Sequence, residues 1–492
     1  MKLKKLLAET HIECPTELDE MEISGIAYDS RQVKKDNMFI CIKGYDTDGH
    51  KYVKDAVLKG AAILISEQEL GILKVPVLMA QGTRKVLSKI SANFYDHPTK
   101  NIRIFGVTGT NGKTTITYMI KNIMDASLES CGILGTIAYK FGDKVYESVN
   151  TTPESLELQR LFSEMRREGI KNCVMEVSSH SLALSRTADI CFDYSAFTNL
   201  TPDHMDFHEN LDDYFASKKK LFYQTSKAST INIDDIYGKK LFEELKENKV
   251  PAFSHSLKNK EADFYGEILS STEKGSEIAL FRDGELVGNI SIRTPGTFSI
   301  YNALTTASIC IMAGIDFSLV KKGLEALSGV PGRFELVENT KSMTVIVDYA
   351  HTPDALEKVL KTALGFKRGR LICVFGCGGD RDTKKRPMMG KAAGELADYC
   401  IITSDNPRTE NQATITSDIE AGIYDTGCIY EIIENRYEAI KKAISIYRKG
   451  DILVIAGKGH EDYQIIGTVK SHFDDREVVR EIIDASLVKE VK

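Results

Sequence analysis

The stretch IRIFGVTGTNGKTTITYMIKNIM, residues 102–124, decides the fold of this chain. Its first part, residues 102–107, is an apolar run typical of a buried strand, and an amphipathic helical pattern begins at Ile116. Between them lies a loop of glycine, threonine, asparagine and lysine. Strand, glycine-rich loop and helix in this order are typical of a phosphate-binding loop, because backbone N–H groups at a helix start face an anion. We therefore expect an α/β domain that binds ATP or GTP at this loop.

Three residue types in the loop favour nucleotide phosphates over an ordinary turn. Gly109 and Gly112 let the backbone curl around an anion, and Lys113 adds charge for the β and γ phosphates. The hydroxyl of Thr114 or Thr115 can bind Mg²⁺. The strict G-x4-G-K-[ST] pattern requires a glycine at position 107, but that residue is Val107 and the glycine is Gly106. The alternative is therefore an ordinary glycine-rich turn between a strand and a helix. The loop residues expected to contact the nucleotide are Gly109, Thr110, Asn111, Gly112, Lys113, Thr114 and Thr115.

The composition is that of an ordinary soluble protein. The chain has 492 residues, a net charge of −6, 42% hydrophobic residues and 27% charged residues, which excludes global disorder and a basic nucleic-acid coat. No apolar run approaches the roughly 20 residues of a spanning helix, and the start MKLKKLLAETHIEC is too short in apolar residues for a signal peptide. We expect a cytoplasmic protein that neither enters a membrane nor binds nucleic acid. The ten cysteines are expected to be reduced, mostly buried residues.

Two polar, proline-containing segments divide the chain. HPTKN (97–101) and VPGRFE (330–335) look like linkers, so we expect domains at 1–99, 100–331 and 332–492. Strands alternate with helical patterns in each part, which indicates βαβ units and mainly parallel sheets, while residues 262–293 alternate and are expected to form an antiparallel appendage. The strongest strand candidates are 61–66, 75–79, 102–107, 172–177, 193–200, 229–234, 343–350, 370–376, 398–404 and 451–457.

Polar and charged side chains follow the strand candidates. Glu176 ends a strand beside the phosphate loop and is a candidate Mg²⁺ ligand. The alternative is that it is an ordinary carboxylate exposed to solvent at the end of a strand. In open α/β sheets, ligands bind beyond the carboxyl ends of the strands. The segments expected to converge there in the last domain are Asp348 with His351, GGDRD (378–382), DNPR (405–408) and GKGHE (457–461).

Nine motifs in one order carry a family resemblance. They are GTNGKTT (109–115), EVSSH (176–180), NLTPDHMDFH (199–208), YNALTTAS (301–308), GRFE (332–335), DYAHTPD (348–354), GCGGDRD (376–382), TSDNPR (403–408) and AGKGHEDYQ (456–464). The chain resembles the Mur ligases, the ATP-dependent amide ligases of peptidoglycan synthesis, over nearly its whole length. The resemblance implies a small N-terminal α/β domain that binds UDP, a central P-loop domain with a parallel sheet, and a Rossmann-like C-terminal domain.

The resemblance also implies a reaction. The chain is most similar to the branch that adds the third residue of the stem peptide to UDP-N-acetylmuramoyl-L-Ala-D-Glu. ATP would phosphorylate the D-Glu γ-carboxylate, and the incoming amine would displace phosphate. Phosphoryl transfer between anions depends on positioning and charge neutralisation, which suits a lysine and Mg²⁺. The expected cofactors are ATP and Mg²⁺, the expected partners are these small molecules, and the expected state is a monomer.

Residue roles follow from the same resemblance. The family's catalytic positions match Lys113, Glu176, His204 and Lys218, of which Lys218 would be carbamylated (N6-carboxylysine). Metal would be held by Thr115, Glu176, His204 and Lys218. Outside the phosphate loop, ATP would contact Asn302, Arg333, Asp348 and His351. The UDP-linked substrate would contact Ser30, Thr151, Thr152, Ser178 and Arg186, with the runs DSR (29–31) and KGYDTDGH (43–50) holding its UDP.

The added amino acid is expected to be meso-diaminopimelate. Its extra carboxylate calls for a planar bidentate donor, and DNPR supplies Arg408, whereas lysine-adding members usually differ after the proline. Glu461 suits the distal ammonium. The matching pocket residues are Arg381, Asp405, Asn406, Arg408, Gly457 and Glu461.

Some features leave alternatives open. Leu184 stands where the family often has Gln, and Ser299 where it often has Asn. L-lysine addition is the alternative within the branch, and folylpolyglutamate synthases share the phosphate loop. An ATPase coupled to motion and a catalytically silent nucleotide-binding module are the alternatives outside the ligases.

Overall fold

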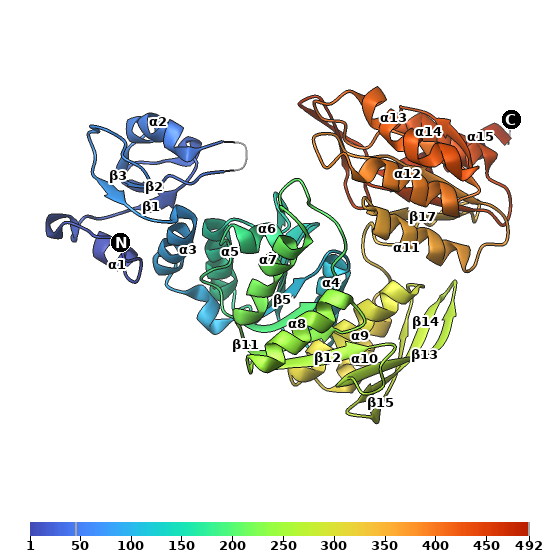
Figure 1. Ribbon diagram of the computed structural model, residues 1–492, viewed down its shortest axis with the longest axis horizontal. Helices are drawn as coiled ribbons and strands as arrows, with labels where there is room; N and C mark the ends of the chain where they lie inside the picture. The colour runs from blue at the N-terminus through green and yellow to red at the C-terminus, as the bar shows by residue number, and fades with distance from the viewer. Residues whose placement is uncertain (45–46, 491–492) are drawn as a thin grey trace.

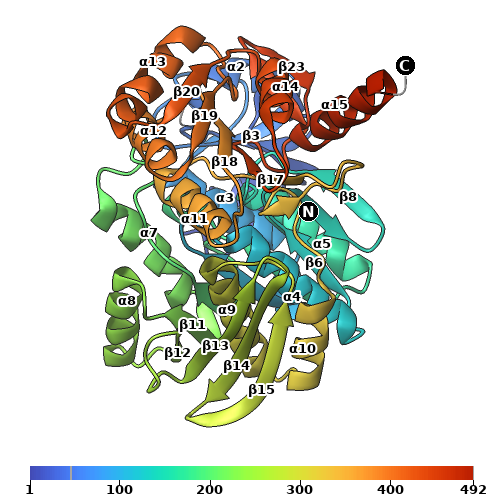
Figure 2. The ribbon, with the colours of Figure 1, turned by 90° about the vertical axis from the view of Figure 1, so that its right-hand side faces the viewer.

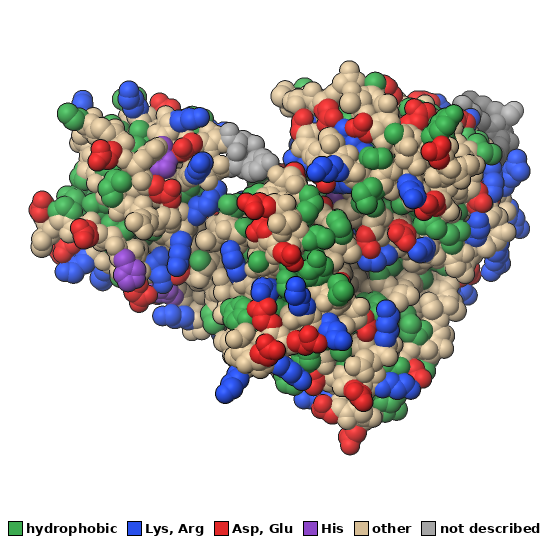
Figure 3. All heavy atoms as spheres, in the orientation of Figure 1, with side chains coloured by type: hydrophobic (Ala, Val, Ile, Leu, Met, Phe, Trp, Pro, Cys, Tyr) green, Lys and Arg blue, Asp and Glu red, His purple; other side chains and the backbone are tan. Residues whose placement is uncertain are grey.

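The computed structural model describes residues 1–44 and 47–490, with side chains described through residue 485. Figure 1 shows three domains, with the N-terminal and C-terminal domains on different sides of the central one. Charged side chains of both signs are interspersed over the face seen in Figure 3. Within the described chain, every helix is too short or too polar to cross a membrane.

The N-terminal domain is built on a four-stranded parallel sheet in the order β1-β2-β3-β4. Alternate residues of β3 pack against Leu87 and Ile90 of the longest helix, which gives the domain its own core. The elements are α1 (Leu3–Leu6), β1 (Gly25–Ala27), β2 (Asn37–Ile40), α2 (Val53–Leu58), β3 (Ala61–Ser66), β4 (Val77–Met79) and α3 (Thr83–Phe94).

The central domain is one eleven-stranded sheet, ordered β15-β14-β13-β12-β11-β10-β5-β9-β6-β7-β8. Its strands are β5 (Arg103–Thr108), β6 (Cys131–Leu134), β7 (Ala138–Phe141), β8 (Lys144–Glu147), β9 (Asn172–Glu176), β10 (Phe192–Phe197), β11 (Thr225–Asn232), β12 (Ala252–Ser256), β13 (Phe264–Thr272), β14 (Gly275–Arg282) and β15 (Glu285–Ile292). The strands from β12 to β6 are parallel, so their carboxyl ends share one edge. The expected antiparallel strands are β13–β15, and they continue the main sheet (Figure 2).

Helices cover both faces of this sheet. One apolar cluster joins the sheet to α4, α9 and α10, and a second joins its other face to α5 and α7. The helices are α4 (Lys113–Ala126), α5 (Ser155–Arg167), α6 (Ser179–Ala183), α7 (Leu211–Tyr223), α8 (Ile236–Glu247), α9 (Thr297–Met312) and α10 (Phe317–Ala326). A helix on each face follows from right-handed βαβ crossovers and leaves the carboxyl edge open for a ligand.

The C-terminal domain has a six-stranded sheet, β16-β17-β21-β18-β19-β20, parallel except at β16. Its strands are β16 (Glu335–Leu336), β17 (Thr344–Asp348), β18 (Leu371–Phe375), β19 (Tyr399–Ile402), β20 (Ile429–Ile432) and β21 (Ile452–Ala456), and β22 (Tyr463–Ile466) pairs with β23 (Val469–His472) as a hairpin. Helices α11 (Pro353–Leu364), α12 (Lys385–Leu396) and α13 (Gln412–Ile423) pack on one face, and α14 (Arg436–Ile446) and α15 (Asp475–Glu490) on the other.

Candidate active site

The phosphate loop connects β5 to α4 and requires two glycines. Gly109 has φ +146° and Gly112 has φ +93°, which are conformations that side chains rarely adopt. A Cβ at Gly109 would stand 1.8 Å from Thr198 Oγ1, and one at Gly112 would stand 2.4 Å from Asn302 Oδ1. The loop therefore packs directly against the carboxyl end of β10 and the first turns of α9, with Asn302 beside it.

Lys113 lies folded over its own loop. Its Nζ donates to the carbonyls of Gly109 (2.9 Å) and Thr110 (2.8 Å). Burial lowers the pKa of Lys113, and the nearby Glu176 carboxylate opposes that shift. An anion entering the loop would favour the charged form of this amine and offer it an alternative to the two carbonyls.

Glu176 ends β9 as a buried carboxylate held by three donors. It accepts hydrogen bonds from Thr114 Oγ1 (3.1 Å), Thr136 N (2.8 Å) and Thr136 Oγ1 (3.1 Å). Arg333 Nη2 in turn donates to Thr114 Oγ1 at 3.0 Å, which links the C-terminal side of the cleft to the phosphate loop. Of the two threonines at the end of the phosphate loop, Thr114 contacts Glu176, whereas Thr115 lines the same cavity.

Lys218 is buried on α7 directly behind the phosphate loop. Its Nζ donates to the Gly109 carbonyl at 2.9 Å and lies 4.4 Å from the centre of the Tyr214 ring. Burial lowers its pKa well below the usual value, and the neighbouring Lys113 lowers it further. The adjacent Lys219 instead pairs with Glu244 at 2.8 Å near the surface. Of the three consecutive lysines on this helix, Lys218 is therefore the one buried against the phosphate loop.

Asp203 and His204 place a carboxylate and an imidazole at the cavity, and burial lowers the pKa of His204 to about 3. Asp203 Oδ2 lies 3.4 Å from His204 Nε2, and His204 has φ +59°, a strained backbone for a residue other than glycine. Burial disfavours the Asp203 carboxylate, but His204, His351 and Lys385 outweigh burial and lower its pKa to about 2. Asp203 is an anion at this site that the sequence reasoning did not select. The PDH run in the sequence was its only signal.

A cavity of about 470 Å³ collects most of the predicted nucleotide residues. It lies between the central and C-terminal domains, which are joined there by a 2.8 Å hydrogen bond from Asn111 Nδ2 to Asp354 Oδ2. Lys358 Nζ lies 2.7 Å from the same carboxylate. The predicted residues that line the cavity are Thr110, Asn111, Gly112, Lys113, Thr114, Thr115, Thr151, Glu176, His204, Asn302, Arg333, Asp348 and His351.

The C-terminal wall of the cavity is formed by the end of β17. The Asp348 carboxylate accepts the backbone N–H groups of Phe334 (2.6 Å) and Ala350 (2.7 Å), which fixes the linker against the strand. Burial raises the pKa of Asp348, and the Arg333 guanidinium opposes the shift. That guanidinium lies 4.3 Å from the centre of the Tyr349 ring. Arg333 is therefore held between the two domains by a stacked ring and a threonine.

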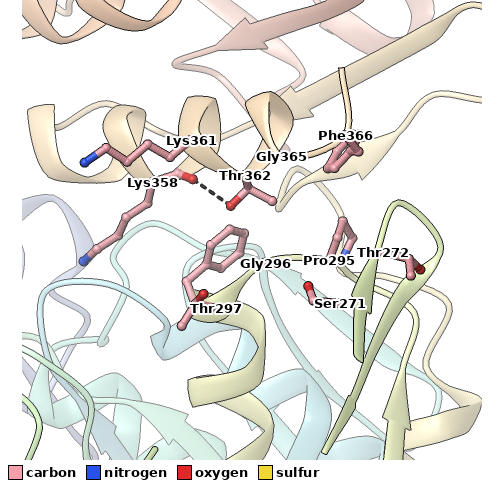
Figure 4. Close-up of a pocket in the computed structure, with 11 residues that line it drawn as sticks. Ser271, Thr272, Pro295, Gly296, Thr297, Lys358, Lys361, Thr362, Gly365 and Phe366 are labelled. Atoms are coloured by element: carbon pink, nitrogen blue, oxygen red, sulfur yellow. Dashed lines mark hydrogen bonds between the residues drawn. The ribbon is translucent and has the colours of Figure 1, made fainter. Parts of the chain in front are cut away.

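A second cavity of about 380 Å³ adjoins the first and shares Thr297, Phe298 and Lys358 with it. Figure 4 shows it between the start of α9 and the helix α11, where Thr362 Oγ1 donates to the Lys358 carbonyl at 2.8 Å. The space between the two domains thus extends past the nucleotide cavity along α11.

Four of the five predicted contacts of the UDP-linked substrate meet beyond β9. Thr152 Oγ1 donates to the Glu176 carbonyl (2.8 Å) and accepts from Ser178 N (3.0 Å), while Arg186 Nη1 donates to the Thr152 carbonyl (3.0 Å). Thr151 Oγ1 lies 3.1 Å from Thr136 Oγ1. These residues therefore lie next to the nucleotide cavity, which Thr151 and Glu176 also line.

The remaining predicted contact, Ser30, lies in a short 3-10 helix of the N-terminal domain (Ser30–Gln32). Glu154, which the sequence reasoning missed, links the two domains: its carboxylate lies 2.9 Å from Arg84 and 3.2 Å from Arg186. Two residues of the predicted UDP run, Tyr45 and Asp46, lie outside the described residues.

Most of the predicted amino-acid residues cluster at the carboxyl ends of β19 and β21. Asn406 Nδ2 donates to Glu461 Oε2 at 2.9 Å. Arg408 Nη1 donates to the Gly379 carbonyl at 2.9 Å, and Arg408 has φ +53°, a strained conformation held by a bridge to Ile466. Gly457 is required because a Cβ there would stand 2.6 Å from Asp405 Oδ2.

Two residues of this cluster differ from the prediction made from the sequence. Lys458 is fully buried and donates to Asn406 Oδ1 at 3.2 Å, with Glu461 Oε2 at 3.4 Å, and the sequence reasoning missed it. Arg381 is exposed, and its Nη1 donates to the carbonyl of Asp380 beside it. The structure therefore joins Asp405, Asn406, Gly457 and Glu461 closely and leaves Arg381 at the rim.

A phosphate loop, a buried carboxylate and a pocket on the facing domain define a nucleotide-dependent enzyme that works in an interdomain cleft. The model of the Mur ligase middle domain matches residues 107–310, that of the Mur ligase glutamate ligase domain residues 332–459, and that of the Mur ligase family catalytic domain residues 22–95. The chain belongs to the Mur ligase family and is a ligase. The family resemblance and the α/β fold class expected from the sequence are confirmed.

The chain is similar to characterised proteins over nearly its whole length. It is 48% identical over 464 residues to the UDP-N-acetylmuramoyl-L-alanyl-D-glutamate--2,6-diaminopimelate ligase of Clostridioides difficile, which covers 94% of this chain and 95% of the relative. It is 47% identical over 486 residues to ligase 1 of the same name from Clostridium acetobutylicum, covering 98% and 99%. A solved structure of an enzyme with this name is 32% identical, with a TM-score of 0.69 and 99% of both chains covered.

Proposed function

We propose that the chain joins meso-diaminopimelate to the D-Glu γ-carboxylate of UDP-N-acetylmuramoyl-L-Ala-D-Glu, with ATP as the source of activation. The observation that carries this proposal is the cluster of Arg408, Asn406 and Glu461 on the C-terminal domain, in which Asn406 donates to Glu461 and Arg408 donates to the Asn406 carbonyl. Tyr349 connects this cluster to the nucleotide cavity, because it lines the cavity and also senses the carboxylates of the cluster. Burial is the main cause of its raised pKa, and the carboxylates of Glu461 and Asp405 raise the pKa further. The names of the relatives support the same substrates.

The charges of the pocket favour diaminopimelate over L-lysine. Glu461 would take the distal ammonium, which both amino acids carry, and Arg408 would take the extra carboxylate, which only diaminopimelate carries. Carbonyls engage Arg408 through Nη1, so the opposite edge of the guanidinium is the one we assign to the carboxylate. With lysine bound, Arg408 would be left without an anion from the substrate, at a cost typical of an unpaired charged donor.

The residues around Glu176 fit the Mg²⁺ ion that ATP-dependent chemistry requires. Glu176 and Thr114 offer oxygen atoms, which Mg²⁺ prefers, whereas the imidazole of His204 is a less usual ligand. Bound Mg²⁺ would neutralise phosphate oxygens during phosphoryl transfer. Lys113 would leave its two backbone carbonyls and donate to the same phosphates. Thr115 lines the cavity beside them, and both threonines stay candidates.

Lys218 is proposed to be carbamylated. CO₂ reacts with an uncharged amine: the amine nitrogen bonds to carbon, and one proton is released, giving a carbamate anion. Burial and Lys113 lower the pKa of Lys218 and so favour the uncharged form. The product would place an anion beside Lys113 and a second oxygen ligand at the cavity.

The two domains would exclude water from the activated substrate. The acyl phosphate formed on D-Glu hydrolyses readily, so a cleft closed by Asn111–Asp354 and Arg333–Thr114 protects it. We assign the UDP-linked substrate to residues 1–99 and the cluster around Thr152, ATP to residues 100–331, and the amino acid to residues 332–492. Because every proposed subsite comes from one chain, we propose that a single copy can carry out the reaction.

Phosphate release tests the proposed reaction. We expect turnover with ATP, UDP-N-acetylmuramoyl-L-Ala-D-Glu and diaminopimelate, and none without an amine. Arg408→Ala should lower kcat/KM for diaminopimelate by about 10- to 100-fold, because a charge-assisted contact is lost. Arg368→Ala, at an exposed position, should leave it unchanged. Equal phosphate release without any amine would contradict the ligase reaction, and preferred use of L-lysine would contradict only the choice of amino acid.

The two threonines of the loop give a matched test of the metal site. Thr114→Val removes the hydroxyl that contacts Glu176 and Arg333, and we expect the Mg²⁺ concentration for half-maximal activity to rise about tenfold, as for the loss of one good ligand. Thr115→Val keeps these contacts and serves as its control. A larger effect of Thr115→Val would show that Thr115 is the metal ligand, as the family resemblance implies.

A further inference from the structure

Two cysteines of the C-terminal domain face each other away from the active site. Cys400 lies in β19, fully buried, and Cys428 immediately precedes β20 and is half-buried. Their sulfur atoms are 3.7 Å apart. A third thiol, Cys373 of β18, is the register partner of Cys400 on its other side. The three thiols thus lie side by side across neighbouring segments of the sheet, and of the three only Cys428 is partly exposed to solvent.

The environment gives the two thiols different chemistry. Contact with Cys400 lowers the pKa of Cys428, because a neighbouring S–H can stabilise the thiolate. Hydrogen bonding with Cys373 and Cys428 raises the pKa of Cys400, and burial of the thiol contributes a smaller rise in the same direction. Because Cys428 is half-buried and Cys400 is fully buried, an oxidant in solution meets Cys428 first, with the Cys400 sulfur 3.7 Å away.

We propose that Cys428 and Cys400 form a peroxide-sensitive pair that closes to a disulfide. The Cys428 thiolate attacks one oxygen of hydrogen peroxide, the O–O bond breaks, and hydroxide leaves, giving a sulfenic acid. The Cys400 sulfur then attacks the Cys428 sulfur, the S–O bond breaks, and the thiol proton leaves with the hydroxyl group as water. The peroxide is reduced to water, and the two thiols are oxidised to one disulfide.

The position of the pair separates this chemistry from the ligase reaction. Both cysteines lie near the amino-terminal ends of parallel strands, whereas the pocket of Asp405, Asn406 and Arg408 follows the carboxyl end of β19. We therefore expect the disulfide form to keep its ligase activity. Closing the disulfide would instead protect Cys428 from irreversible oxidation to sulfinic acid, since a sulfenic acid with a thiol partner is consumed first.

Peptide mapping of the full-length protein after hydrogen peroxide tests the proposal. In the wild type we expect a cross-linked pair of peptides containing Cys400 and Cys428, with two hydrogens lost and full reversal by dithiothreitol. In Cys400→Ser we expect sulfinic acid at Cys428 instead. Cys191, an exposed thiol on the central domain, serves as the control, and Cys191→Ser should leave the cross-link intact.

Other outcomes would overturn the proposal. A wild-type Cys428 that accumulates sulfinic acid as fast as in Cys400→Ser would show that Cys400 does not resolve it. A Cys373–Cys400 cross-link in place of the expected one, or no reaction at Cys428 while Cys191 is oxidised, would do the same. The readout is chemical and needs no substrate, so it stands or falls separately from the ligase function.

Discussion

Replacement of Lys218 by Ala is expected to lower kcat by about 10²–10³-fold, the usual cost of losing one fixed charged group at a reacting centre. Lys218 is buried behind the phosphate loop, bonded to the Gly109 carbonyl, and has a strongly lowered pKa. As a carbamate it would act on the phosphates through the metal site, so the loss should fall on kcat more than on the KM for diaminopimelate. Steady-state phosphate release with each substrate varied in turn measures this split.

Lys219→Ala is the matched control, because Lys219 is the next residue and pairs with Glu244 near the surface. We expect it to change kcat little, since exposed ion pairs contribute at most about 1 kcal/mol. A short carboxylate such as formate should partly restore Lys218→Ala by filling the vacated position with an anion. Full activity of Lys218→Ala would refute a role for this side chain, and activity independent of dissolved CO₂ together with an unmodified lysine mass would refute carbamylation.

The parts of the site that lie in one continuous segment could be predicted from the sequence. The phosphate loop is such a segment, because its glycines, Lys113 and the following helix are consecutive, and their spacing alone carries the geometry. Glu176 was selected for a similar reason, as a carboxylate at the end of an apolar strand. Asp203, Glu154 and Lys458 were missed because their roles depend on partners from other loops or another domain. Asp203 and Lys458 stand within the motifs NLTPDHMDFH and AGKGHEDYQ, but the motifs do not show these partners.

Several of the missed strands lie at the edge of a sheet and are partly exposed. β20 (Ile429–Ile432) is an edge strand whose residues are all at least partly exposed, so it lacks the buried apolar run that marked its neighbours. The hairpin of β7 and β8 also extends the central sheet at its edge, with β8 largely exposed. Burial on both faces makes the predicted strands largely apolar. The buried strands β2 and β6 were missed as well, and each is only four residues long.

A buried ion pair beneath the predicted amino-acid-binding residues is expected to make the C-terminal domain sensitive to the loss of either partner alone. Arg436 and Asp475 are both fully buried, with Nε and Nη2 each 2.7 Å from a carboxylate oxygen. Arg436 also donates to the carbonyls of Ser404 (3.3 Å) and Ala456 (3.0 Å), at the carboxyl ends of β19 and β21. One guanidinium therefore joins α14 and α15 to the loops that carry Asp405 and Gly457.

Arg436→Leu should destabilise this domain by about 3–5 kcal/mol, because it leaves the Asp475 carboxylate buried without its cation. Hydrogen exchange of peptides from β19 and β21 isolates the free energy of this domain within the three-domain chain. The double variant Arg436→Leu/Asp475→Leu removes the stranded charge and should lose only about 1–3 kcal/mol, the cost of the two carbonyls left without donors. Lys441→Ala, which breaks the exposed pair with Glu438, should cost no more than about 1 kcal/mol. If Arg436→Leu were no worse than the double variant, the pair would not anchor the pocket, and the two loops would have to be held by the apolar clusters on either side of the sheet.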